Sequence, residues 1–447
     1  MTPRVPATAL VPIPAPFSIE ELYKNPPLAF GHEMHKLFGF DPEYVNLNHG
    51  SYGSLPLPVR AACDMWTTEA EANPDKFMRL VFRPHITRVR QRVAKLIGAN
   101  ADECVMVANT SSGISTVLRN FTFNASDVLI GANTTYPAVL SALKYLSDIP
   151  SHPTVSIFTI QFPTTHEAIL ETFREYIRKV KEEHNDPGQT RKFVAVIDTI
   201  VSLPAVLLPW KAMVTICRDA GVYTVLDAAH SIGQEPDINL SEVQPDFWVS
   251  NCHKWLYAKR GCAVLYVPER NQHFIRSPFP TPDNYHSPQD KDYNSPEEFI
   301  KLFEWTGTID HVPHMSVNAA LDFREWLGGE HRINDYTRKL AMEGGKHLAR
   351  RLGTELLDPE GHMTLSMVNV ELPLPGKIPN TGDISTLIRD TLLLKWNTSA
   401  FCFRHNEKWW VRCSAQIFNE ISDFDFLADA LIDACAKVKE HYIGQAN

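Results

Sequence analysis

Between residues 100 and 270 the chain alternates short apolar runs with stretches of helical periodicity. The apolar runs are CVMVAN (104–109), FVAVID (193–198), VYTVLD (222–227), DFWVS (246–250) and CAVLYVP (262–268), with further ones near 130 and 155. Such alternation predicts βα units and a mostly parallel sheet covered by helices on both faces. In open sheets of this kind ligands bind beyond the carboxyl ends of the strands. We therefore expect the polar residues that close these runs to form the site.

A chain of 447 residues exceeds the size at which one hydrophobic core keeps growing, which predicts two domains. We assign 61–313 to a large α/β domain. Amphipathic helices, the strand-like segments LSMVNVEL and WWVRCSAQ, and a helix over about 422–440 predict a smaller α+β domain over 314–447. The proline-rich residues 1–25 are expected to form a flexible arm, and 26–60 to pack with the small domain.

Charge and composition exclude several classes of partner. The net charge is −9 and no basic stripe is present, which argues against nucleic acid and favours a small substrate. No stretch approaches the roughly 18 apolar residues of a membrane span, so no membrane partner is expected. The eight cysteines include no CxxC pair, which indicates neither a disulfide framework nor a metal cluster and favours a cytoplasmic location.

Asp227 and Lys254 are the residues with the strongest chemical meaning. Asp227 closes the strand VYTVLD, and Lys254 follows the next strand in FWVSNCHKWLY. Both are expected at the same edge of the sheet, where a buried lysine has a lowered pKa and becomes a usable nucleophile. Pyridoxal phosphate needs a lysine for its Schiff base and a carboxylate for its ring nitrogen. An ordinary Asp–Lys salt bridge within the core is the alternative.

Three other segments are compatible with such a site, and each has an ordinary alternative. ANTSSGIS (108–115) offers hydroxyls and backbone N–H groups for a phosphate, although a plain helix cap would look the same. Tyr136 follows a strand where a ring could stack on the cofactor or simply pack. Arg412, in the small domain, suits a substrate carboxylate or a surface ion pair.

The order of these motifs resembles the fold-type-I pyridoxal-phosphate enzymes of the class V aminotransferase group. That group includes cysteine desulfurases, isopenicillin N epimerase-like proteins and the carbon–sulfur lyases of ergothioneine biosynthesis. The resemblance extends from NLNHGSYG (46–53) to VRCSAQIFNE (411–420). It implies the corresponding fold, with a large domain built on a mostly parallel sheet and a small α+β domain.

The resemblance also implies a role for individual residues. Lys254 would form the Schiff base and Asp227 would bind the pyridine nitrogen, while His230 would contact the phenolic oxygen. The phosphate would be held by Ser111, Ser112 and His253, and Tyr136 would stack on the ring. Gly307-Thr308 matches a pair that completes the phosphate site across a dimer interface, which implies a homodimer with shared active sites.

The segments NLNHGSYGSLP, VSNCHKWLYAKRGCAV and VRCSAQIFNEISDF look most similar to the fungal hercynylcysteine sulfoxide lyases and the loline-type alkaloid enzymes of secondary metabolism. Desulfurases have a serine where this chain has Asn251, and no matching mobile-loop cysteine is seen. A persulfide-forming desulfurase is therefore not expected.

We accordingly expect a lyase that removes the α-proton of an amino acid with Lys254 as base and eliminates at a carbon–sulfur bond. Arg412 is expected to bind the substrate carboxylate, with Asn48, His49 and Arg404 as further substrate contacts; a turn or a solvated loop explains the last three equally well. A Mannich-type cyclase acting by γ-elimination and an amino-acid epimerase begin with the same step. A cofactor-free scaffold protein is the non-enzyme alternative, and the absence of GxGxxG after an early strand argues against a nicotinamide dehydrogenase.

Overall fold

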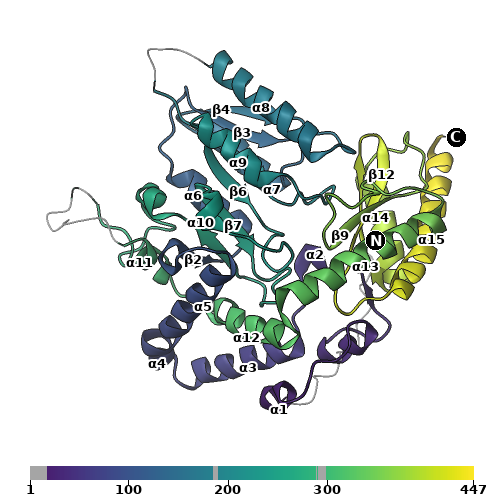
Figure 1. Ribbon diagram of the computed structural model, residues 1–447, viewed down its shortest axis with the longest axis horizontal. Helices are drawn as coiled ribbons and strands as arrows, with labels where there is room; N and C mark the ends of the chain where they lie inside the picture. The colour runs from purple at the N-terminus through teal and green to yellow at the C-terminus, as the bar shows by residue number, and fades with distance from the viewer. Residues whose placement is uncertain (1–17, 185–189, 288, 290–297, 447) are drawn as a thin grey trace.

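The computed structural model describes residues 18–184, 190–287, 289 and 298–446, and Figure 1 labels its main elements. Most of the predicted arm, residues 1–17, lies outside the described residues; its end forms the short helix α1, Ile19–Tyr23. Further along, α2 (His49–Tyr52), α3 (Leu57–Ala72), α4 (Pro74–Lys76) and α5 (Phe82–Leu96) precede the first strand of the main sheet.

The main sheet has seven strands in the order β2-β8-β7-β6-β5-β3-β4. All neighbours are parallel except β8, which runs antiparallel to β2 and β7. The predicted α/β class with a mostly parallel sheet is therefore confirmed. The strands are β2 (Cys104–Val107), β3 (Val128–Ala132), β4 (Thr154–Phe158), β5 (Phe193–Asp198), β6 (Tyr223–Asp227), β7 (Phe247–Asn251) and β8 (Ala263–Tyr266).

Helices cover both faces of this sheet because successive strand residues point to opposite sides. In β5, Val194 and Val196 pack in one apolar cluster and Ala195 and Ile197 in another. The first cluster is closed by α6 (Thr110–Asn120), α7 (Pro137–Asp148) and α11 (Phe299–Glu304); the second by α5, α8 (His166–Glu183), α9 (Trp210–Asp219) and α12 (Val312–Trp326). The parity of β5 and β6 places Asp198 and Asp227 on the α6–α7 side.

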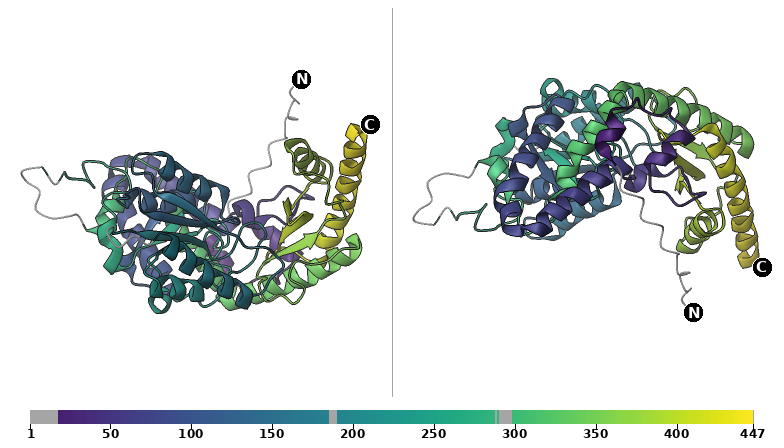
Figure 2. Two further views of the ribbon diagram at one scale, coloured as in Figure 1. Left: turned by 90° about the horizontal axis from the view of Figure 1, so that it is seen from above. Right: turned by 90° about the horizontal axis from the view of Figure 1, so that it is seen from below.

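The C-terminal part is built on a three-stranded antiparallel sheet in the order β11-β12-β9. Its strands are β9 (Met367–Glu371), β11 (Phe401–His405) and β12 (Lys408–Ser414), and its helices are α13 (Gly329–Leu352), α14 (Gly382–Asp390) and α15 (Ile421–Ala446). They enclose an apolar cluster of their own. Figure 2 shows this part at one end of the molecule.

The N-terminal segment joins the two parts. The short strand β1 (Val45–Asn46) pairs with β10 (Thr398–Ser399), and Asn48 bridges to Ser414. Helix α2 consequently lies between the main sheet and β9 (Figure 1). The predicted boundary at 313/314 falls inside α12, which packs against α3 and α5. The domain limits stay a prediction.

Candidate active site

The amine of Lys254 lies within hydrogen-bonding distance of His230. Lys254 follows β7 and His230 follows β6, and the Nζ to Nε2 distance is 3.2 Å. Burial lowers the pKa of Lys254 to about 8, with a further contribution from the charge of Arg412 and an opposing one from Asp227. Above about pH 8 this amine is therefore neutral, the form that acts as a nucleophile or base.

Asp227 stands beside a second buried carboxylate. The register of the parallel pair β5–β6 places Asp198 directly against Asp227. Burial and the charge of Asp227 raise the pKa of Asp198 well above its usual range. The pKa of Asp227 is also raised, mainly by burial, but the charge of Lys254 opposes this. Two adjacent buried carboxylates disfavour double ionisation, and the charge of Lys254, which lowers the pKa of Asp227, favours the negative charge on that residue.

Arg412, on β12, approaches the same site from the small sheet. Its Nη2 donates to Ser51 Oγ at 2.6 Å and to Asn48 Oδ1 at 3.1 Å, and its Nη1 donates to the Ser202 carbonyl at 3.1 Å. These partners are neutral, and the Nε atom is buried without a hydrogen-bond partner. Burial lowers the pKa of Arg412 to about 10, so it stays charged at neutral pH. Such a group offers an anion-binding position.

His49 is buried against the backbone of Lys254. Only 1% of its surface is exposed, and its Nε2 donates to the Lys254 carbonyl at 2.7 Å. It is therefore bound to the backbone of the lysine and is closed off from solvent; its contact with a substrate stays a prediction. Gly53 allows the turn that carries His49 to approach the backbone of His253 closely. Its φ is +68°, and a Cβ there would stand 1.7 Å from the His253 carbonyl oxygen.

The N-terminus of α6 is tied to Asn251, the last residue of the strand that precedes Lys254. Asn251 Oδ1 accepts from the Thr110 N–H at 3.0 Å, and Thr110 Oγ1 is buried without a partner. Ser111 is exposed, whereas Ser112 is engaged in a capping box with Asn109. A helix N-terminus with an unused buried hydroxyl suits a phosphate.

His253 is oriented by the backbone. Its Nδ1 donates to the Cys262 carbonyl at 3.0 Å, and burial lowers its pKa to about 4. In this neutral form Nε2 is an acceptor, so His253 donates to a phosphate only when the anion's charge draws a second proton onto the ring.

Three further predicted residues lie at the surface. Tyr136 is 44% exposed and directly precedes α7, and Thr308 is exposed. Arg404 is exposed on β11 and donates to the Gly376 carbonyl at 2.7 Å. It pairs with Trp409, whereas Phe401 pairs with Arg412, so strand alternation places Arg404 on the opposite face of the hairpin from Arg412. The structure does not bring Arg404 to the site.

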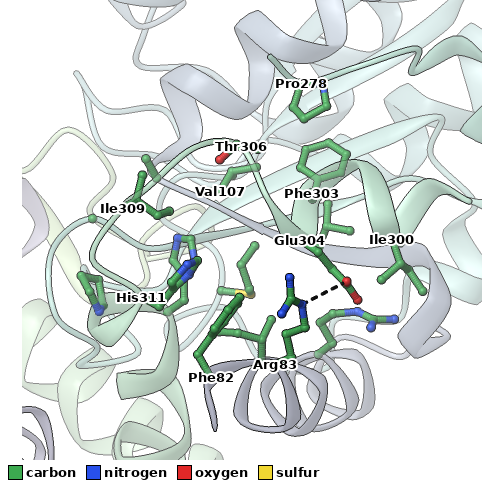
Figure 3. A pocket seen from close by; sticks show the side chains of 18 of the residues that line it. Phe82, Arg83, Val107, Pro278, Ile300, Phe303, Glu304, Thr306, Ile309 and His311 are labelled. Carbon is green, nitrogen blue, oxygen red and sulfur yellow. Dashed lines mark ion pairs between the residues drawn. The ribbon is translucent and has the colours of Figure 1, made fainter. Parts of the chain in front are cut away.

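A further cavity of about 380 Å³ has Ser112, near the start of α6, in its lining. Figure 3 shows its apolar lining, in which Phe82 stacks on His311 with 3.9 Å between ring centroids. An ion pair between Arg83 and Glu304, 3.5 Å long, lies at one side. Ser112 and Thr306 also line this cavity, so it adjoins the predicted phosphate site and the loop that carries Thr308.

These groups fit pyridoxal phosphate. Lys254 offers an amine of lowered pKa to an aldehyde, Asp227 offers a charge to a ring nitrogen, and Thr110 leaves a buried hydroxyl at a helix N-terminus for a phosphate. When bound, the cofactor supplies an electron sink for a carbanion at the substrate Cα. Fold and site together define a fold-type-I pyridoxal-phosphate enzyme.

Comparison with known proteins assigns the family. The model of the family "Aminotransferase class-V" matches residues 55–374, and the chain belongs to this family. It is 35% identical to the L-cysteine desulfhydrase-like protein lolT1 of Epichloe uncinata, over 94% of this chain and 98% of that protein. It is 31% identical to the hercynylcysteine sulfoxide lyase of Schizosaccharomyces pombe, over 91% of this chain and 98% of that protein.

Solved structures have the same fold. The apo cysteine desulfurase of Thermococcus onnurineus NA1 superposes with a TM-score of 0.72 at 18% identity, covering 92% of this chain and 100% of that one. The predicted family, fold type and cofactor are confirmed.

Sequence reasoning missed four residues of this site: Thr110, Asp198, Trp255 and Arg324. Asp198 closes FVAVID as Asp227 closes VYTVLD, and Thr110 lies within ANTSSGIS, so both carried a local signal. Trp255 adjoins Lys254, and its indole Nε1 lies 3.2 Å from His230 Nδ1. Arg324 lies 69 residues after Trp255, and nothing in its local sequence points to the site.

Proposed function

We propose that this pyridoxal-phosphate-dependent lyase cleaves the carbon–sulfur bond of a cysteine S-conjugate, with an S-substituted cysteine sulfoxide of the hercynylcysteine type as the favoured substrate. The strongest support for this proposal is that one turn, α2, adjoins both reactive groups. His49 holds the Lys254 carbonyl, while Asn48 and Ser51 hold the Arg412 guanidinium. A proton acceptor and a carboxylate binder are thereby kept in one fixed geometry, as removal of an α-proton requires.

The chain's residues divide the work as follows. Arg412, whose hydrogen-bond partners are all neutral, binds the substrate carboxylate. Lys254 takes the α-proton with its neutral amine, and Asp227 contributes the negative charge beside it. Loss of the sulfur group at Cβ, as a sulfenic acid from a sulfoxide, leaves 2-aminoacrylate. Water converts that product to pyruvate and ammonium.

The names of the relatives support this class of substrate. One is called a hercynylcysteine sulfoxide lyase and another an L-cysteine desulfhydrase-like protein. Free L-cysteine is therefore the second candidate substrate. A cyclase acting on a γ leaving group and an epimerase are the other candidates that share proton removal at Cα.

A panel of amino acids tests the proposal. The holoenzyme is incubated separately with a cysteine S-conjugate sulfoxide, free L-cysteine, an amino acid with a γ leaving group and an isopenicillin-like amino acid in deuterated water. Pyruvate formed at least tenfold faster from the sulfoxide than from cysteine is the expected result. If only free cysteine yields pyruvate, together with sulfide, then cysteine and not the sulfoxide is the substrate. A ring-closed product, or deuterium at an inverted Cα without pyruvate, would overturn the lyase assignment.

We also propose that two copies share their active sites, with Thr308 of one copy completing the phosphate site of the other. Two features support this proposal. Gly307 has a φ of +108° and nothing within 4 Å of a Cβ placed there, and Thr308 is exposed. The adjoining cavity is lined by apolar side chains, including Phe303 and Ile309, which a second copy would cover. Closed two-fold pairing is also the commonest arrangement of oligomers.

Hybrid dimers of Lys254→Ala and Thr308→Ala chains, purified with two affinity tags, test the shared site. If Thr308 acts across the interface, one site of the hybrid has both residues, and activity should recover to about half that of wild type. If Thr308 acts within its own chain, both sites lack one residue and no recovery occurs. A monomer at working concentration would equally contradict the proposal.

For the location, we propose the cytoplasm. The eight cysteines are free thiols, which agrees with a reducing compartment. Among the helices of the described residues, none is both long enough and apolar enough to cross a membrane.

A further inference from the structure

Both ring nitrogens of His230 are engaged, and the two partners differ in kind. The ring is 2% exposed. Trp255 Nε1 lies 3.2 Å from Nδ1, and Lys254 Nζ lies 3.2 Å from Nε2. An indole N–H can only donate, so Nδ1 has to be the acceptor and a neutral ring must carry its proton on Nε2. That proton points at the lysine.

This geometry sets the state of the amine. An ammonium group has no lone pair, so it cannot accept a hydrogen bond from Nε2–H. A hydrogen bond between Nε2 and Nζ in this tautomer therefore requires the neutral amine. Burial and the charge of Lys254 hold the pKa of His230 well below its usual range, in agreement with a neutral ring.

We propose that Trp255 is a positioning residue that fixes His230 as the Nε2-protonated tautomer and thereby favours the neutral amine of Lys254. Trp255 has this role before any substrate arrives, whichever amino acid the enzyme consumes. Once Lys254 is engaged by the cofactor, the same Nε2–H remains a hydrogen-bond donor at this position of the site.

The backbone around Trp255 is held in place by Arg324, which is almost fully buried on α12. Its Nη1 donates to the Trp255 carbonyl at 2.7 Å and its Nη2 to the Gly233 carbonyl at 2.9 Å. Glu330 accepts from the same guanidinium at 2.5 and 2.6 Å. Gly233 has a φ of +83°, and a Cβ there would stand 2.7 Å from the Trp255 carbonyl oxygen. The loops that carry His230 and Lys254 are therefore locked together beneath the pair.

The other ionisable groups around the pair do not titrate near pH 8. Burial lowers the pKa of His49 to about 3 and that of His253 to about 4, so both are neutral there. Arg412, with a pKa of about 10, stays charged. Asp198 and Asp227, the carboxyl groups that close β5 and β6, also lie near the pair, and burial raises the pKa of both. A midpoint near pH 8 therefore reports Lys254.

The first test measures how readily Lys254 of the cofactor-free protein is methylated by formaldehyde and cyanoborohydride between pH 6 and 10. Only the neutral amine reacts, and the Lys254 peptide is quantified by mass spectrometry. The wild-type midpoint is expected near pH 8. In Trp255→Phe an aromatic ring is kept but the N–H is lost, so Nε2 is free to accept from an ammonium group. The midpoint should then rise by at least 0.5 pH unit.

Trp409→Phe is the matched control. Trp409 is equally buried and its Nε1 donates to the Ile378 carbonyl at 2.9 Å, within the C-terminal part. The Trp409→Phe variant loses a comparable hydrogen bond. The pH midpoint of Lys254 methylation in this variant should therefore stay within 0.2 pH unit of wild type. An equal rise in both variants would mean that the loss of any buried indole raises the midpoint of Lys254. That result would overturn the role assigned to Trp255.

The second test needs no variant of Trp255. Nitrogen-15 NMR of histidine-labelled, cofactor-free wild-type protein reads the tautomer, with His230→Gln used to assign the signals. The expected result is a ring protonated on Nε2. A ring protonated on Nδ1, or an unchanged Lys254 midpoint in folded Trp255→Phe, would overturn the proposal.

Discussion

Asp198 and Asp227 occupy paired positions at the carboxyl ends of neighbouring parallel strands, and their surroundings shift their pKa values unequally. The register of β5 and β6 places them side by side, and burial with the neighbouring charge raises the pKa of Asp198 well above its usual range. Asp227 has the positive charge of Lys254 beside it. Two chemically identical side chains are therefore given different roles by one neighbour.

Asparagine at each of these positions should consequently have unequal effects. Asp227→Asn removes the charge beside the ring nitrogen and should slow pyruvate formation by about 100-fold or more, comparable to the loss of one preorganised electrostatic group. Asp198→Asn replaces a carboxyl group whose raised pKa favours the neutral form, and should change the rate by no more than about fivefold, the value of one ordinary hydrogen bond. Steady-state kinetics of both variants, each saturated with cofactor, provide the comparison. Equal losses would contradict the assignment of charge.

Lys254→Met should stabilise the cofactor-free protein. The pKa of Lys254 is about 8 in the folded protein against 10.5 when unperturbed. Burying the charged lysine therefore lowers the free energy of unfolding, and this penalty is complete below pH 8. That cost declines between pH 8 and 10.5, where the unfolded chain alone still binds the proton. Methionine should therefore raise the free energy of unfolding at pH 7, by at most about 3 kcal/mol.

Denaturant unfolding at pH 7 and pH 9.5 measures this effect, and the gain from Lys254→Met should be smaller at the higher pH. Lys144→Met, at an exposed position on α7, is the control and should show no such pH dependence. The holo form of Lys254→Met should also lose borohydride-stable attachment of the cofactor. A gain that grows with pH would contradict the lowered pKa.

The activity should depend on the shape of the side chain at position 412 as well as on its charge. Lysine keeps the charge but cannot reproduce the fork held by Ser51 and Asn48, so Arg412→Lys should reduce kcat/KM by about 10- to 100-fold, the value of a hydrogen bond to a charged group. Most of the loss should appear in KM, and the amide of the same substrate should bind equally weakly to both forms. Arg404→Lys, on the opposite face of the hairpin, should leave kcat/KM within about twofold, as surface substitutions usually do.

Thr110→Val should have opposite effects on the apo and holo proteins. The buried hydroxyl has no partner in the cofactor-free structure, so its removal should raise the free energy of unfolding by about 1 kcal/mol. If the hydroxyl binds the phosphate, the same change should weaken cofactor binding about tenfold. Thermal unfolding of the apo protein and a cofactor titration followed by absorbance give the two values. Unchanged cofactor affinity would remove Thr110 from the phosphate site.

Much of the candidate site could be predicted from the sequence because its signals are local. Short apolar runs between stretches of helical periodicity predict the strands of the main sheet, and the polar residues that close β6 and follow β7 point to Asp227 and Lys254. The segment NLNHGSYG was recognisable as part of the family pattern, although its pattern did not reveal which side chain faces which way.

Tertiary structure alone decided the side-chain geometry around these residues. His49 is bound to the backbone of Lys254, and Arg404 lies on the far face of its hairpin, because strand register and the packing of α2 settle direction, and neither can be read from spacing. Arg324 reaches Trp255 across 69 positions of the chain. The charge on Asp227, the tautomer of His230 and the neutral amine of Lys254 depend on burial and on partners distant in sequence, so no local pattern could encode them.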